Sequence, residues 1–301
     1  MTLAAVIVHW QDPAETLACV ESLAGEPPDH VIVVDNGSRE PVGELLAARA
    51  PAVEVLRLPS NRGYAGGANA GMERALARGA DVVLLLNNDA RVATGAQAAA
   101  LRGLAGDGRI GVVGARVVTR EDPDRLWLAW GDVTYRQSLI ALRGADVPDG
   151  APWRTPRDVA WIAGCAMWFR AEALRAIGLL DEDFFAYHEE VDWCARAREA
   201  GWRVVYWPDA VVSHTGRGSH GSARSIRIRK YFAARNTILF ARKHARPHEW
   251  AKLAAYLGVM LPLELAYHAA RGSAGDVLWK VRGVRDALTG AVPPFEQLGL
   301  R

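Results

Sequence analysis

Residues 82–89 read Val-Val-Leu-Leu-Leu-Asn-Asn-Asp, an apolar run that stops abruptly at three polar, oxygen-bearing side chains. An uncharged run of this length is typical of a strand that is buried on both faces. We therefore expect a strand over 82–86 that delivers Asn87, Asn88 and Asp89 to the edge of a sheet. Oxygen-bearing side chains in such a place suit a hard divalent cation.

The preceding residues alternate between apolar strands and helices. Strands are expected at 3–8, 31–34 and 53–56, and helices at 13–24, 41–49 and from the glycine-rich segment 61–71 to about 78. Because these strands are apolar throughout except at Glu54, they predict an α/β fold with a mostly parallel sheet covered on both faces. Ligands of such sheets bind beyond the carboxyl ends of the strands, where Asp35, Asn61 and Asp89 are placed.

The second half of the chain is less regular. Residues 161–169 are expected to form a strand, and 204–207 another that Pro208 closes. A short strand at 210–213 then delivers His214, and the pattern from about residue 224 onward is helical.

An acidic cluster lies between aromatic residues at 184–193, where Glu189, Glu190 and Asp192 occur within four residues. Desolvating such groups is costly unless they are paired, and a carboxylate held there has a raised pKa and can act as a base. The alternative is a structural ion network in which Arg196 and Arg198 pair with these acids.

The charge of the chain excludes a general nucleic-acid binder, since 301 residues carry a net charge of only +2. The segment 210–248, however, contains nine basic residues and no acid, which favours phosphates, a diphosphate or an acidic membrane surface. Three widely spaced cysteines predict buried free thiols in a reducing compartment. No signal peptide or membrane-spanning run is recognisable, so we expect a protein that is cytoplasmic or peripheral at the inner face of the cell membrane.

Six motifs in one order make the sequence recognisable. They are Val-Asp-Asn-Gly-Ser at 34–38, Asn-Arg-Gly-Tyr-Ala-Gly-Gly-Ala-Asn at 61–69, Leu-Asn-Asn-Asp at 86–89, Gly-Leu-Leu-Asp-Glu-Asp-Phe-Phe at 178–185, Tyr-His-Glu-Glu-Val-Asp-Trp at 187–193, and His214 followed by Gly216, Gly218 and Ser219. The combination, with the pair Arg235-Asn236 after it, resembles the family-2 inverting glycosyltransferases of the GT-A fold, in particular their rhamnosyltransferase-like branch. The resemblance covers roughly residues 3–245.

This resemblance implies an enzyme that moves a sugar from a nucleoside diphosphate donor to an acceptor hydroxyl. Glu190 matches the catalytic base of the family, with Glu189 and Asp192 beside it. Asp89 and His214 match the ligands of a divalent metal, Mn²⁺ or Mg²⁺. Two positions depart from the family pattern: Asn87 replaces the first acid of an Asp-X-Asp motif, and Glu190 is one methylene longer than the usual Asp.

The resemblance also implies the donor site and the substrates. Asp35 matches the residue that holds the base or ribose, although Asp-Asn-Gly-Ser is equally turn chemistry. The donor is expected to be a dTDP- or UDP-sugar, and the acceptor a glycan, a lipid-linked glycan or a small molecule. The residues expected to bind the donor are Asp35, Asn61, Arg62, Gly66, Asn69, Asn87 and Asn88.

We expect a catalytic domain over 1–220, with a donor half to about 110 and an acceptor half from 111, and a helical extension over 221–301. The apolar segment 253–267 contains Pro262 and Glu264, so it suits an interfacial helix better than a membrane span. Alternatively, it packs on the catalytic domain or on a second subunit of a homodimer. Two other functions remain open: a sugar nucleotidyltransferase and a non-catalytic relative that binds glycan or lipid.

Overall fold

The computed structural model describes residues 1–136, 139–215, 223–272 and 274–300. Its main sheet contains the parallel strands β4, β1, β2 and β3, in that order, which span Val82–Asn87, Leu3–His9, His30–Asp35 and Glu54–Arg57. Val8 pairs with both Val34 and Asn87, so three strands end at one edge of the sheet. The polar residues that follow these strands are thereby brought together.

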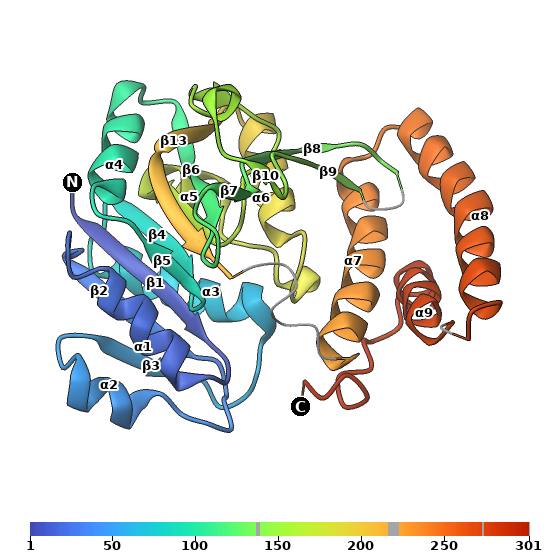
Figure 1. The fold of residues 1–301 in the computed structure, drawn as a ribbon, viewed down its shortest axis with the longest axis horizontal. Helices are drawn as coiled ribbons and strands as arrows, with labels where there is room; N and C mark the ends of the chain where they lie inside the picture. The colour runs from blue at the N-terminus through green and yellow to red at the C-terminus, as the bar shows by residue number, and fades with distance from the viewer. Residues whose placement is uncertain (137–138, 216–222, 273, 301) are drawn as a thin grey trace.

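The other half of the sheet is mixed. Strand β12 (Ala166–Arg170) runs antiparallel between β4 and β6 (Ile110–Thr119), and β13 (Arg203–His214) pairs in parallel with β6. The remaining strands of this sheet are β5 (Ala90–Val92), β7 (Arg125–Leu128), β10 (Val147–Pro148) and β11 (Arg157–Asp158), while β8 (Trp130–Val133) and β9 (Ile140–Arg143) form a separate antiparallel pair. The predicted α/β fold with a mostly parallel central sheet is confirmed (Figure 1).

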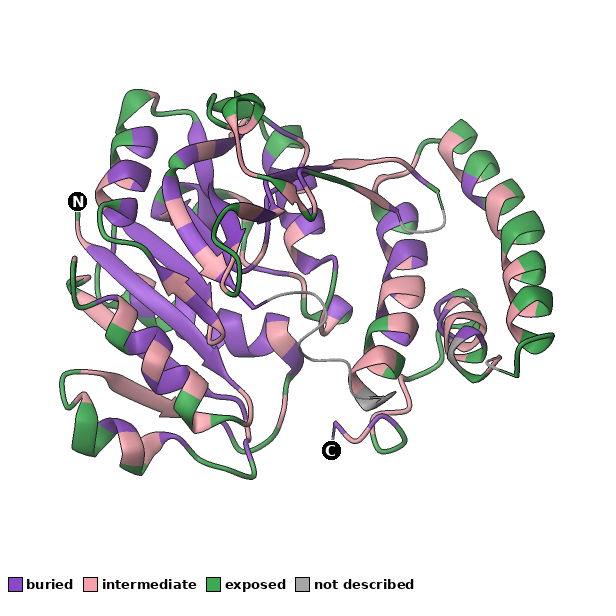
Figure 2. Ribbon diagram, in the orientation of Figure 1, coloured by how far each residue is buried: buried purple, intermediate pink, exposed green. Residues whose placement is uncertain are grey.

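Helices pack against this sheet and bury it (Figure 2). Helix α3 contacts β1 and β2, and α4 contacts β6 and β13. A Cβ at Gly71 would lie 2.3 Å from Cγ1 of Val6, so this glycine allows α3 to lie close to the sheet. The helices of this part are α1 (Pro13–Ser22), α2 (Gly43–Arg49), α3 (Gly63–Ala77), α4 (Ala96–Gly106), α5 (Ala171–Ile177) and α6 (Glu189–Glu199), with short 3-10 turns at Ala151–Trp153 and Glu182–Phe184.

The strand expected at 161–169 is shorter than predicted. Trp161 forms only an isolated bridge to Gly131, and β12 begins at Ala166. The intervening Gly164 and Cys165 form a turn whose carbonyl at Cys165 accepts a hydrogen bond of 2.9 Å from the backbone N–H of Asn87. The turn therefore adjoins the end of β4 and shapes the same edge of the sheet.

Pro208 does not end a strand, contrary to the prediction from sequence. Strand β13 continues to His214, and its register against β6 shifts between Trp207 and Val211. This bulge keeps proline, which has no N–H, out of the hydrogen-bond ladder. The Pro208 carbonyl instead accepts a hydrogen bond of 3.0 Å from Nε of Arg116.

The carboxyl-terminal part is helical, as expected, and lies beside the sheet domain (Figure 1). It contains α7 (Ala223–His244), α8 (Pro247–Ala269) and α9 (Gly275–Thr289). Pro262 lies inside α8 without ending it. Among the described helices, none is both long enough and apolar enough to cross a membrane. The predicted boundary at 220–221, with Gly216, Gly218 and Ser219, lies outside the described residues.

Candidate active site

A cavity of about 550 Å³ opens beyond the carboxyl ends of β1, β2 and β4. It collects side chains from the loop after β4, the loop before α3, the start of α6 and the end of β13. The predicted site residues that line it are Asn61, Asn87, Asn88, Asp89, Glu189, Glu190 and His214. Those that do not line it are Asp35, Arg62, Gly66, Asn69 and Asp192.

Asp89 and His214 lie in contact at this cavity. Oδ1 of Asp89 is 3.0 Å from Nε2 of His214, and its Oδ2 accepts a hydrogen bond of 3.0 Å from the hydroxyl of Thr215. Burial acts to raise the pKa of Asp89, but hydrogen bonds from His214 and Thr215, together with the charge of His214, outweigh burial and lower that pKa to about 2. Asp89 is therefore ionised at neutral pH, which is the state that binds a cation.

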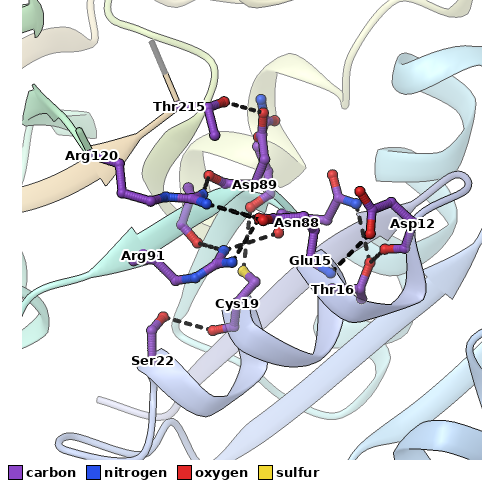
Figure 3. A network of polar contacts seen from close by, with 12 residues as sticks. Asp12, Glu15, Thr16, Cys19, Ser22, Asn88, Asp89, Arg91, Arg120 and Thr215 are labelled. Atoms are coloured by element: carbon purple, nitrogen blue, oxygen red, sulfur yellow. Dashed lines mark hydrogen bonds and ion pairs between the residues drawn. The ribbon is translucent and has the colours of Figure 1, made fainter. Parts of the chain in front are cut away.

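Two arginines hold the loop that carries Asp89 (Figure 3). Arg120 donates to the backbone carbonyl of Asp89, and Arg91 donates to that of Ala90 at 2.9 Å. Both guanidinium groups pair with Glu15 of α1, at 2.7 Å for Arg91 and 3.0 Å for Arg120. These two arginines and Glu15 belong to no sequence motif and meet only through the fold, so no local pattern predicts their role.

Helix α1 also holds the other two residues of this loop. Sγ of Cys19 donates to the carbonyl of Asn87 at 3.3 Å, and Nδ2 of Asn88 donates to Oγ1 of Thr16 at 3.1 Å (Figure 3). Oδ1 of Asn87 is buried and has no hydrogen-bond partner within the described part of the chain. A buried oxygen of this kind is available to a ligand that enters the cavity. All three cysteines are buried free thiols, as predicted.

Glu189 and Glu190 begin helix α6, and few hydrogen-bond donors contact their carboxyl groups. One oxygen of each, Oε2, is buried and has no hydrogen-bond partner among the described residues. Burial and the neighbouring Glu190 raise the pKa of Glu189 well above its ordinary value. Burial also raises the pKa of Glu190 to about 7, although backbone N–H groups oppose the increase. A carboxyl group with this pKa is suited to accept a proton at neutral pH.

Asp192 lies one helical turn further, outside the cavity lining. Its Oδ2 pairs with Arg196 at 2.8 Å, and its Oδ1 pairs with His244 of α7 at 2.8 Å. Burial acts to raise the pKa of Asp192, but His244 and Arg196 lower it overall. At this position the structure contains the ion network that sequence analysis weighed as the alternative.

Asn36, rather than Asp35, lines the cavity after β2. The buried Asp35 carboxylate accepts a hydrogen bond of 2.9 Å from the Ser38 N–H and pairs with Arg57 at 3.1 Å. This is the turn geometry that Asp-Asn-Gly-Ser predicts. Nδ2 of Asn36 donates to the Gly63 carbonyl at 2.8 Å and thereby joins the turn to the start of α3. The only sequence signal for Asn36 is its place in that turn.

Three predicted donor residues near the start of α3 make contacts within the protein. Arg62 pairs with Glu182 at 2.9 Å, and Nδ2 of Asn69 donates to the carbonyl of Leu180 at 2.8 Å. A Cβ at Gly66 would lie 2.7 Å from Cβ of Arg62, so close packing requires glycine there. These contacts attach α3 to the segment that leads into the acidic pair.

Aromatic side chains complete the lining. The ring of Trp127 lies 4.6 Å from that of His214, centroid to centroid. Faces of this kind suit stacking against a sugar ring. The aromatic residues at the cavity are Trp10, Tyr64, Trp127, Phe185 and Tyr187.

Known proteins resemble this chain in sequence. The family model described as "Glycosyltransferase like family 2" matches residues 2–233. An N-acetylglucosaminyl-diphospho-decaprenol L-rhamnosyltransferase of Mycobacterium tuberculosis is 30% identical over 223 residues, which cover 66% of this chain and 71% of the relative. Galactofuranosyltransferase GlfT1 of the same organism is 32% identical over 219 residues, or 70% of this chain and 69% of the relative.

Solved structures share the fold. The mannosyltransferase PcManGT from Pyrobaculum calidifontis, solved with GDP-Man and Mn²⁺, matches with a TM-score of 0.58 at 16% identity over 97% of this chain and 88% of its own. GalNAc-T7, solved with UDP, GalNAc and Mn²⁺, matches with a TM-score of 0.59 at 17% identity over 90% of this chain and 58% of its own. The family model and the structural neighbours agree with the expectation from the sequence motifs: the chain is a GT-A protein and belongs to glycosyltransferase-like family 2.

Proposed function

We propose that this glycosyltransferase transfers a sugar from a nucleoside diphosphate to an acceptor hydroxyl with inversion at the anomeric carbon. The observation that carries the proposal is the pairing of two unlike acidic sites in one cavity. Asp89 has a pKa lowered to about 2, whereas that of Glu190 is raised to about 7. Carboxyl groups whose environments separate their pKa values in this way are suited to separate roles.

The Asp89 side of the cavity fits a divalent metal. Asp89 and His214 supply one oxygen and one nitrogen ligand, and the unpartnered Oδ1 of Asn87 supplies another oxygen nearby in the chain. Among the described residues, no group of three His, Cys, Asp or Glu side chains could hold a metal by itself, which leaves room for diphosphate oxygens as ligands. When bound, Mn²⁺ or Mg²⁺ would neutralise charge on the departing diphosphate.

Glu190 is the proposed base. It accepts the proton of the acceptor hydroxyl as that oxygen forms a bond to the anomeric carbon. The bond from the anomeric carbon to the diphosphate breaks on the opposite face, and the nucleoside diphosphate leaves with the bonding electrons. Glu189 lies beside this base, and its own pKa is raised by burial and by the charge of Glu190. The longer arm of Glu190, compared with Asp, places its carboxyl further from the helix backbone.

The donor and acceptor classes follow from the relatives. Neighbours of the same fold were solved with UDP or GDP-Man, and the relatives are named for rhamnosyl and galactofuranosyl transfer. We infer a dTDP- or UDP-linked sugar, rhamnose or a similar sugar, and a glycan acceptor of a cell wall or related polysaccharide. Residues 1–110 would hold the donor, 111–220 the acceptor, and 221–301 would form the helical extension.

A lipid-linked acceptor is favoured by the surface of α8. Val259, Leu263 and Tyr267 are 60%, 58% and 55% exposed, and their spacing of four residues places them on one face of that helix. Glu264, an acid within this stretch, pairs with Lys280 at 2.6 Å, and Arg271 lies over the Tyr267 ring at 3.8 Å. An apolar face with a cation at its end fits the interface of an anionic membrane.

Flotation with liposomes tests this contact. The protein should float with phosphatidylglycerol vesicles at low salt, and Leu263→Asp should reduce flotation several-fold. Leu278→Asp changes a leucine of α9 that is 53% exposed and is the matched control. If both variants still floated like the original protein, the membrane contact would be contradicted. A dimer in solution that Leu263→Asp dissociates would assign the face to a second copy of the chain.

A panel of dTDP-rhamnose, UDP-galactofuranose, UDP-N-acetylglucosamine and GDP-mannose tests the main proposal. A true donor should raise the melting temperature, since a ligand at 100 times its Kd stabilises by about 2.7 kcal/mol. The same donor should be consumed in the presence of Mn²⁺. Stabilisation without consumption, under any metal or acceptor tested, would favour the non-catalytic relative. A sugar nucleotidyltransferase is not favoured, because the chain belongs to glycosyltransferase-like family 2.

A further inference from the structure

The backbone that leads into the acidic pair adopts an unusual conformation. Phe185, Tyr187 and His188 have φ values of 62°, 70° and 72°, in the left-handed region that favours glycine. His188 directly precedes Glu189, the first residue of α6. Side chains with a Cβ adopt this region only where surrounding contacts impose it, and such residues cluster at functional sites. The question is which contacts impose it here.

A single side chain from α7 binds this segment at three points. Nδ2 of Asn236 lies 2.8 Å from the carbonyl of Phe184, 2.8 Å from that of Ala186 and 2.7 Å from that of Tyr187. Asn236 is fully buried. Because an amide nitrogen carries only two hydrogens, at least one of these bonds is shared between carbonyls. These carbonyls converge on Nδ2 because the backbone reverses its handedness between them.

Neighbouring residues of the same turn of α7 reinforce the contact. Nη1 of Arg235 donates to the carbonyl of Asp183 at 2.7 Å and to Oδ1 of Asn236 at 3.0 Å, which fixes the amide with Nδ2 toward the carbonyls. The ring of Phe232 stacks on that of Phe185, with centroids 5.1 Å apart and planes at 14°. Helix α7 therefore contacts the whole segment from Asp183 to Tyr187.

We propose that Asn236 is a positioning residue, which holds the left-handed turn at 185–188 so that Glu189 and Glu190 begin α6 at the cavity. Asn236 does not itself line the cavity, but it binds the carbonyls of Ala186 and Tyr187, which do, and it acts on the acids through this backbone. This inference rests on the proposed function, in which Glu190 is the base. A displacement of about 1 Å at a reacting group can lower a rate by about 10²-fold, so the position of this turn matters for turnover.

The test compares Asn236→Ala and Asn236→Asp with Thr237→Ala. Thr237 is the next residue of α7, equally buried, and its hydroxyl donates only to the carbonyl of Ala233 within the helix, at 2.8 Å. Aspartate has nearly the shape of asparagine but no N–H to donate. We measure the melting temperature, the Kd for UDP with Mn²⁺, and kcat for release of nucleoside diphosphate from the donor that the panel selects.

Both Asn236 variants should lower kcat by about 10- to 100-fold and change the Kd for UDP less than about threefold. Thr237→Ala should keep kcat within about threefold of the original protein. Asn236→Ala combined with Glu190→Gln should be no slower than Glu190→Gln alone, because Asn236 acts only through that acid.

Several results would overturn the proposal. One is a kcat of the double variant that is lower than that of Glu190→Gln alone. Another is an equal kcat for Asn236→Ala and Thr237→Ala. A third is that neither Asn236 variant folds although Thr237→Ala does. Full activity of Glu190→Gln would instead refute the proposed function itself, whatever the Asn236 variants do. The two failures are thus distinguishable.

Discussion

The loop 87–89 and the segment 185–190 contribute to the lining of the same cavity but are held in different ways. Charged side chains hold the first: Glu15, Arg91 and Arg120 form a network around its backbone (Figure 3). Neutral contacts hold the second, namely the amide of Asn236 and the ring of Phe232. The first loop therefore has cations close to its acid, whereas no cation pairs with Glu189 or Glu190 among the residues that the structure describes.

This difference decides how each acid behaves. Asp89 lies beside an imidazole and keeps its charge, whereas burial raises the pKa of Glu189 and Glu190 and makes them resist ionisation. A carboxylate that stays charged suits a metal, and one that gains and loses a proton near neutral pH suits a base. The surroundings, rather than the residue type, divide the two roles within one cavity.

The largest effect is expected from Glu190→Gln, which keeps the shape of the side chain but cannot accept the proton. Turnover should fall by about 10²- to 10⁴-fold, while the affinity for UDP with Mn²⁺ changes little. Glu189→Gln should cost less. The activity of the original protein should also decline as pH falls below about 7, because protonation of Glu190 removes the base.

Glu199→Gln is the control for this prediction, since Glu199 ends the same helix with a side chain that is 63% exposed. Near-normal turnover of Glu190→Gln would transfer the role of base to Glu189. The ion network of Asp192 makes it a poor third candidate, because its pKa is lowered.

A smaller effect is expected on the metal side. Asp89→Asn and His214→Ala should each raise the Mn²⁺ concentration for half-maximal activity by about tenfold or more, and EDTA should abolish activity until Mn²⁺ or Mg²⁺ is restored. Asp146→Asn, a surface substitution, should leave the requirement unchanged. Full activity in EDTA would refute the metal and leave stabilisation of the diphosphate to arginines.

The basic segment 210–248 illustrates what sequence alone could not resolve. Arg242 donates to the carbonyls of Ala287 and Leu288, and Lys243 pairs with Asp181, so part of the segment joins helices rather than anions. Arg227 and Arg229 are exposed. The composition shows that the net charge of this segment is positive, but the groups that its basic side chains bind are decided by tertiary contacts.

The fold was more predictable than the site. An apolar run such as 82–86 predicts its strand because a strand that is buried on both faces needs apolar side chains at every position. The effect of Pro208 was predicted wrongly because the bulge that accommodates it depends on the neighbouring strand. Residues within motifs, such as Asp89 and Glu190, were found at the cavity. The contacts of Asn236 join segments about fifty residues apart, and no local pattern encodes them.

The smallest expected effect is on stability. Because the pKa of Glu189 is raised in the folded protein, the folded state binds a proton more tightly than the unfolded state does. The free energy of unfolding must then fall as pH rises above the ordinary glutamate value of about 4.5. Glu189→Gln removes this penalty and should stabilise the protein at pH 8, with little change at pH 4.5, as measured by urea denaturation.

Glu54→Gln should act in the opposite direction. Glu54 pairs with Arg74 at 2.6 Å and Arg78 at 2.8 Å, and although burial acts to raise its pKa, these arginines lower it overall. Its charge therefore stabilises the folded state above the ordinary pKa, so this substitution should destabilise slightly at pH 8, by less than about 1 kcal/mol. If Glu189→Gln were also destabilising at pH 8, the acidic pair would have to be compensated by a cation, and the contrast between the two walls of the cavity would fail.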